Sequence, residues 1–450
     1  MSFALTLALM VPLALGEEPA ELRYSGSVAP VNRGTVGEPT KRFKVFYLAT
    51  PMKSGGVHLD FHLEERGAGV WHWPERFGRS LLDARLAPTN KVEASLLFDH
   101  QRTARALPVR QPLFEHFDKL QEDARWKVGR VEHRVAGRER VGERECWVVE
   151  AGRDSAHGER VWVDVEQPLV VKLEKRLVRG RGDQFLLSMT LASVSPVDAP
   201  DARKLHTGFT SLLTLQAALR RREGETRSEL SEVQLKLTGA MLERLRSETA
   251  QTPLAKLVVG IARDHERQSA RFSNVRKLAG QHVGRPAPSV ELKTLSGVPL
   301  DWKKLQGRVV VMHFWDYQSD PLEEPYGQVG YLDFLYSKRR KLGADVIGVA
   351  VREKLDVPSA RSDALRSIRK LTNFMNLRYP VTADGGAALK AFGDPRSVGA
   401  ELPLWVVIDH EGNVAHYHSG FYPVERNVGL KALDSVVSDL LRKRHEARSE

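Results

Sequence analysis

The chain has 450 residues, too many for one ordinary hydrophobic core, so two or three domains are expected. Its 42% hydrophobic and 28% charged residues are typical of a folded globular protein and exclude a disordered or fibrous chain. The formal net charge of +11 is spread over short runs without a recognition motif, so we expect no nucleic-acid partner.

The N-terminal residues 1–16, MSFALTLALMVPLALG, are continuously apolar. This run is shorter than the roughly 20 residues that a membrane-spanning helix needs, and it ends in small residues before Glu17 and Glu18. The pattern predicts a signal peptide over 1–16 and export to the periplasm or the cell surface, with an uncleaved short anchor as the alternative. In that location the positive charge favours contact with anionic lipid, a wall polymer or an acidic partner.

Residues 17–200 carry short strands separated by turn residues. Apolar side chains alternate with polar ones in 57–63 and again in 185–191, which is the period of a strand with one buried face. A helix is expected within 112–123, because apolar residues fall there at helical spacing. We therefore predict an antiparallel β-sheet domain, with a curved half-barrel as one form of it.

The order of elements in this domain, with a helix before VAGRERVGERECWVVEA and then RVWVD, is similar to that of lipoprotein-carrier-like half-barrels. This resemblance implies lipid or lipoprotein carriage by the N-terminal sheet as one alternative function. Carriage would require a deep apolar cavity.

The period of the sequence becomes helical from about residue 205 to about 280. One apolar stripe is expected to face a neighbour, and it is made of Leu230, Val233, Leu237, Met241 and Leu245. We predict a helical connector over 205–280, whose helices pack on each other or on a neighbouring domain.

The turn-rich segment 284–288 opens the best-marked part of the sequence, predicted as a domain over 284–445. Its first half reads GRPAPSVELKTLSGVPLDWKKLQGRVVVMHFW, and its second half contains ELPLWVVIDHEGNVAHYHSG. Between these lie a helical pattern at 331–341, a continuous apolar strand at 344–351 and a second helical pattern at 362–374. Over about 281–442 the chain resembles the exported thioredoxin-like (TlpA/ResA-type) thiol-disulfide reductases and their peroxiredoxin (AhpC/TSA redoxin) relatives. The resemblance implies an α/β thioredoxin-like fold.

The sequence departs from this family at the reactive positions. Where the family reads W-x-x-x-C-x-x-C, this chain has Ser319 and Leu322 after Trp315, and its one cysteine is Cys146. The family mechanism needs a thiolate stabilised at a helix N-terminus and a second thiol that releases the product. Neither serine nor leucine can supply these groups, so we predict no catalytic residue, no cofactor and a degenerate active site.

Binding is the role that the resemblance leaves to this site. The family's cis-proline is matched by Pro403, and its neighbouring backbone would pair with an extended peptide of a partner protein. The predicted binding residues are Trp315, Tyr317, Ser319, Asp320, Pro321, Leu402 and Pro403. The alternative is structural: Pro403 shapes a turn and Ser319 caps a helix.

Other candidate groups favour structural roles. His313 could serve Ser319 as a base, but a hydrolase needs a third orienting group. His416 and His418 share a strand face near His410, and we expect a solvated face there and no metal site.

The β-rich domain contains two further candidate groups. Cys146 is expected to be a small buried hydrophobe. The pair Trp71 and Trp73, on either side of His72, could line a ligand surface or belong to the core, and the sequence leaves this open.

The sequence therefore favours an exported binding or scaffold protein. An oxidoreductase of the redoxin type, working through Cys146 or through a partner's thiol, is the enzymatic alternative.

Overall fold

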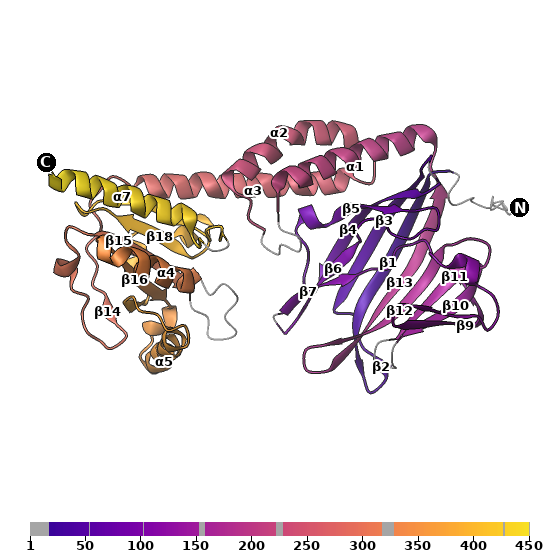
Figure 1. Cartoon of the computed structure of the whole chain (residues 1–450), viewed down its shortest axis with the longest axis horizontal. Coiled ribbons are helices and arrows are strands. Elements are labelled where there is room, and N and C mark those ends of the chain that lie inside the picture. Colours follow the sequence, from indigo (N-terminus) through magenta and orange to yellow (C-terminus); the bar gives the residue numbers. More distant parts are fainter. Residues whose placement is uncertain are drawn as a thin grey trace, which may run out of the picture. The chain divides into compact units, whose positions relative to one another are not determined.

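The computed structural model describes residues 18–53, 55–101, 103–152, 158–221, 228–316, 328–425 and 428–449. The expected signal peptide at 1–16 lies outside these ranges. The described chain divides into two compact units, one up to Glu266 and the other from Arg267 (Figure 1). Within the described ranges, no helix is both long enough and apolar enough to cross a membrane.

The N-terminal unit is built on a large antiparallel sheet. Its eleven strands are β1 (Ala20–Asn32), β2 (Thr35–Val36), β3 (Lys41–Pro51), β4 (Val57–Gly67), β5 (Phe77–Leu82), β8 (Arg125–Val128), β9 (Val131–Val141), β10 (Arg144–Gly152), β11 (Glu159–Asp164), β12 (Val170–Arg179) and β13 (Asp183–Pro196). They lie in the order β5-β4-β3-β1-β13-β12-β11-β10-β9-β8, and β2 pairs with β1. The predicted antiparallel sheet is confirmed.

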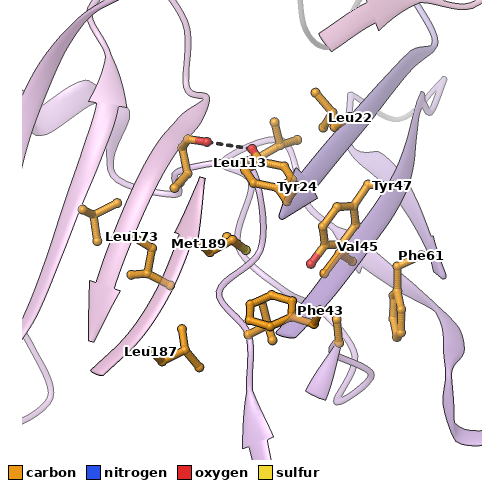
Figure 2. Close-up of a cluster of buried hydrophobic side chains, with 14 of the residues drawn as sticks. Leu22, Tyr24, Phe43, Val45, Tyr47, Phe61, Leu113, Leu173, Leu187 and Met189 are labelled. Carbon is orange, nitrogen blue, oxygen red and sulfur yellow. Dashed lines mark hydrogen bonds between the residues drawn. The ribbon is translucent and has the colours of Figure 1, made fainter. Parts of the chain in front are cut away.

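One face of this sheet is closed by side chains from a separate hairpin and a loop. The hairpin consists of β6 (Ser95–His100) and β7 (Thr103–Pro108). Figure 2 shows sheet residues packed with Leu113 from the loop, and the Tyr24 hydroxyl donates a 2.7 Å hydrogen bond to the Val170 carbonyl. The apolar side chains of this face are buried against each other in one cluster.

The helix predicted within 112–123 is wrong. Only one turn of 3-10 helix forms there, at Phe117–Lys119. Leu113 instead makes a β-bridge with Leu169, and the Phe114 amide donates a 2.7 Å hydrogen bond to the Pro168 carbonyl. The extended backbone required by this pairing overrides the helical spacing of the apolar residues.

Three helices follow the sheet: α1 (Ala199–Leu219), α2 (Glu232–Thr249) and α3 (Ala255–Gly280). Asp198 caps α1 by accepting from the Asp201 amide, and Ser231 caps α2 in a capping box with Gln234. Within the N-terminal unit their apolar sides pack on the sheet face that carries Phe46, Leu48 and Phe77. The first helices of the predicted connector therefore form a layer on the sheet.

The predicted stripe of α2 is partly wrong. Val233 is 76% exposed, whereas Leu235 and Leu242 are buried with Leu245. Val233 lies in the first turn of α2, which begins at Glu232, and its side chain is exposed to solvent.

A buried ion pair joins the sheet to the loop that closes it. Lys41 and Glu65 have fully buried side chains, and Nζ lies 2.8 Å from Oε1. Lys41 also donates to the Gly69 carbonyl at 2.6 Å, while Glu65 accepts from the amides of Trp71 and Leu97. The pair thus satisfies backbone groups of two segments beyond β4.

We expect Lys41→Met to lower the free energy of unfolding of the N-terminal unit by about 3–5 kcal/mol, because it leaves the Glu65 carboxylate buried without its cation. Urea denaturation measures the change. The matched control is Arg42→Met, since Arg42 lies 4.0 Å from an almost fully exposed Glu38. A loss no larger than that of the control would contradict this role for the pair.

The C-terminal unit contains a six-stranded mixed sheet. Its strands are β14 (Lys293–Thr294), β15 (Val309–Asp316), β16 (Ala344–Val351), β17 (Val381–Asp384), β18 (Leu404–Ile408) and β19 (Val414–Ser419). They lie in the order β14-β17-β16-β15-β18-β19, with β15, β16 and β17 parallel and β18 antiparallel to β15. This is the thioredoxin-like topology that the sequence predicts.

The helices of this unit are α4 (Val329–Arg339), α5 (Pro358–Phe374), α6 (Ala387–Ala391) and α7 (Lys431–Ser449). Both faces of β15 are buried, because its alternate side chains enter two separate apolar clusters. The strand predicted at 344–351 is β16, and the helices predicted at 331–341 and 362–374 correspond to α4 and α5.

Candidate functional site

The candidate site lies at the end of the central strand β15. Trp315 is buried there, and Asp316, the last residue of the strand, is exposed. Because Phe314 pairs with Leu404, the Leu402-Pro403 segment joins the sheet beside this strand end. The structure therefore brings Trp315, Leu402 and Pro403 to the same end of the sheet, where β15 ends and β18 begins.

The other predicted site residues cannot be placed in this way. Tyr317, Ser319, Asp320, Pro321 and Leu322 lie outside the described residues.

The Leu402-Pro403 peptide bond is cis. The Pro403 carbonyl accepts from the Gly420 amide at 2.8 Å, so it is used within the sheet. In the part of the chain that the structure describes, no hydrogen bond to the Leu402 backbone is found, and its side chain is half-buried. The amide and carbonyl of Leu402 are therefore the groups at this edge that an extended peptide could pair with.

Behind the strand end lies a stack of aromatic rings. His313 is fully buried, and its ring centroid lies 4.0 Å from that of Trp405 and 5.3 Å from that of Trp315. The described surroundings of His313 are thus aromatic rings of the core, as expected for a structural role.

The stack continues into the last strand and the loop after it. His416 Nε2 lies 2.6 Å from the Tyr422 hydroxyl, and the His418 ring stacks on Tyr422 at 4.2 Å. Both histidines are half-buried, so the expectation of a solvated strand face is wrong: Tyr422 folds back over it. Burial lowers the pKa of His416, and burial together with the neighbouring His416 lowers the pKa of His418 to about 4.

Tyr422 is held in this position by its backbone. The Gln328 side chain donates to the Tyr422 carbonyl at 2.7 Å and accepts from the Tyr422 amide at 3.0 Å. Gln328 is the residue immediately before α4 and is fully buried. The histidine face, the loop after β19 and the start of α4 are thus tied together.

Among the described residues, no group of three or more histidine, cysteine, aspartate or glutamate side chains could hold a metal ion. His410 lies in the turn between β18 and β19, away from the strand positions of His416 and His418.

Cys146 lies in β10 of the N-terminal unit and is completely buried. Its neighbours are Val148, Trp162 and Val171. Burial is the main cause that raises the pKa of its thiol to about 11, with the Asp164 carboxylate adding to the effect. The prediction of a small buried hydrophobe is confirmed.

The open question about Trp71 and Trp73 is answered in favour of the core. Both are buried, and their indole N–H groups donate to the Ser95 carbonyl and to Asp264 respectively.

Sequence reasoning missed Gln328, Trp405 and Tyr422 as parts of this site. A tryptophan in a buried strand reads as core, and a lone Gln or Tyr in a loop carries no pattern. The loop after β19 brings Tyr422 into contact with Gln328 and Trp405, which are distant from it in the sequence or in another strand.

The comparisons with known proteins find similarity in this unit. Residues 282–433 match the family model described as Redoxin. Thiol-disulfide oxidoreductase ResA of Bacillus thuringiensis is 28% identical over 132 residues, which cover 29% of this chain and 66% of that protein. The ResA of Halalkalibacterium halodurans is 23% identical over 164 residues, covering 36% of this chain and 81% of that protein.

Solved structures similar to this chain include a thioredoxin-family thiol:disulfide interchange protein from Chlorobium tepidum. Its sequence identity is 21% and its TM-score is 0.27. The match covers 35% of this chain and 96% of that chain. A secreted disulfide oxidoreductase of Mycobacterium tuberculosis has 18% identity and a TM-score of 0.25, covering 34% of this chain and 96% of that one.

We expect His418→Phe to flatten the pH dependence of stability. Because the folded pKa of His418, about 4, is below the ordinary 6.5, its contribution to stability is present above pH 6.5 and is lost as the pH falls towards 4. The variant should remove about 1–2 kcal/mol of the loss between pH 7 and pH 5, measured by urea denaturation at each pH.

His445→Phe, at an exposed position of α7, is the control for replacing a histidine by phenylalanine. Equal slopes for wild type and His418→Phe would contradict this prediction, because they would mean that the His418 ring binds a proton as readily in the folded as in the unfolded protein.

Proposed function

We propose that the domain that matches the Redoxin model is a redox-inactive module that binds an extended segment of a partner protein. The observation that carries this proposal is the state of the chain's single thiol. Cys146 is buried in the other compact unit, and residues 282–433 contain no cysteine. Thiol-disulfide exchange requires an attacking thiolate and a second thiol to release the product, and this domain supplies neither.

The chemistry of the substituted positions supports the same conclusion. A serine hydroxyl at position 319 cannot be ionised near neutral pH by a helix dipole, which contributes at most about 2 kcal/mol. A leucine at position 322 has no group that could attack a mixed disulfide.

The binding role rests on the backbone beside the cis-proline. Strand-like pairing uses main-chain groups and therefore survives the loss of the cysteines. The available amide and carbonyl of Leu402, next to the buried Trp315, supply such an edge in this domain.

We further propose that the protein is exported. The apolar residues 1–16, followed by acidic residues, support a secretory signal.

A second candidate function is thiol-disulfide oxidoreductase activity, through Cys146 or through a partner's thiol. The names of the ResA relatives favour it. A thiol with a pKa of about 11 would be ionised in roughly one molecule in ten thousand at pH 7, which weighs against Cys146 as a nucleophile.

We expect the purified chain to reduce insulin in the presence of dithiothreitol no faster than the background. The double variant Ser319→Cys/Leu322→Cys should gain reductase activity, because it restores a thiol pair to the family's positions. Cys146→Ser is the control and should leave the background rate unchanged. Wild-type turnover that Cys146→Ser abolishes would establish the oxidoreductase instead.

Binding at the cis-proline edge can be tested with a binder selected from a displayed library of random peptides. Leu402→Glu should weaken that binder at least tenfold, because it places a charge beside the pairing edge. Glu401→Gln, at the exposed neighbouring position, should change the affinity little. Equal affinities of wild type and Leu402→Glu, measured by fluorescence anisotropy, would place the peptide elsewhere.

A further inference from the structure

The outward side of α4 carries large apolar side chains that nothing in the described chain covers. Tyr331 is 36% exposed and Phe334 is 52% exposed. A methyl group at Gly429 would lie 3.7 Å from the Tyr331 ring and 3.8 Å from the Phe334 ring, so both rings flank this glycine. Val428, the residue before Gly429, is also exposed. Exposed apolar groups that gather in this way mark an interaction site.

Basic residues continue the same side of the helix. Lys338 follows Phe334 by four residues, which is one helical turn, and Lys341 follows just after the helix. Leu342 beside it is 57% exposed. We call Tyr331, Phe334, Lys338, Lys341, Leu342 and Val428 the α4 surface.

One nearby carboxylate is shared by two basic side chains. Asp434 pairs with both Lys338 and Arg339, each at 2.7 Å. These three side chains together therefore keep one net positive charge.

The two other acids near the α4 surface have their own cations. Asp333 pairs with Arg378 at 2.6 Å, and Glu425 pairs with Lys431 at 3.4 Å. Among the described residues Lys341 has no acidic partner, so the surface presents net positive charge.

We propose that the α4 surface docks on an anionic lipid membrane. Exposed aromatic and aliphatic side chains flanked by lysines match the boundary between acyl chains and anionic headgroups, where rings insert and ammonium groups meet phosphates. An acidic protein partner would match the lysines but would leave the Tyr331 and Phe334 rings without an apolar counterpart. This docking is independent of the peptide binding proposed above.

The chain offers a clean labelling strategy, because its only cysteine is buried. Phe334→Cys can be labelled with an environment-sensitive fluorophore, and Phe272→Cys, an exposed phenylalanine on α3, is the matched control. With phosphatidylglycerol vesicles we expect a blue shift of the label at 334 and none at 272. Phosphatidylcholine vesicles should shift neither.

Vesicle co-sedimentation of unlabelled protein gives the second measurement. Lys341→Gln should weaken binding to phosphatidylglycerol vesicles about fivefold, which corresponds to roughly 1 kcal/mol per basic residue near an anionic surface. Phe334→Ser should also weaken it, because the variant removes apolar area that would insert between the lipids. Phe272→Ser should not weaken it. Binding that is absent, that is equal on phosphatidylcholine, or that Phe334→Ser leaves unchanged would overturn the proposal.

Discussion

The apolar surroundings of Cys146 constrain what this protein can do with sulfur. A thiolate in that position would lose its hydration, and the nearby Arg144 cation does not offset this loss together with the effect of the Asp164 carboxylate, so the pKa of the thiol rises. Positions 319 and 322, where the resembled family carries its two cysteines, hold serine and leucine. The strand order and the apolar core of the C-terminal unit do not depend on those two sulfurs.

The backbone at the end of β15 and the start of β18 is held in place by its neighbours. β15 and β18 lie side by side, the cis-proline segment joins them at the strand end, and the rings of Trp315, His313 and Trp405 fill the space behind. The loop after β19 is fixed by the double hydrogen bond between Gln328 and Tyr422. These contacts hold backbone groups in place rather than a nucleophile, which is why recognition is the function that we propose.

Local patterns predicted most of this architecture. The strict alternation in 57–63 identifies a strand with one buried face, and the continuous apolar run of 344–351 identifies a strand buried on both. Predictions failed where contacts between segments distant in the sequence determine the local structure. Residues 113–114 pair with 168–169 in place of forming a helix, and Tyr422 covers histidines that read as solvated. The resemblance identified the cis-proline position and the missing sulfurs, but no local signal could indicate the partners of Gln328.

The reactivity of Cys146 in the native protein tests the central claim most directly. Alkylation by iodoacetamide at neutral pH can be followed by mass spectrometry in the absence and presence of urea. The account predicts that the native thiol remains unmodified until the N-terminal unit unfolds. Alkylation of the folded protein at the rate of a free exposed thiol would contradict it.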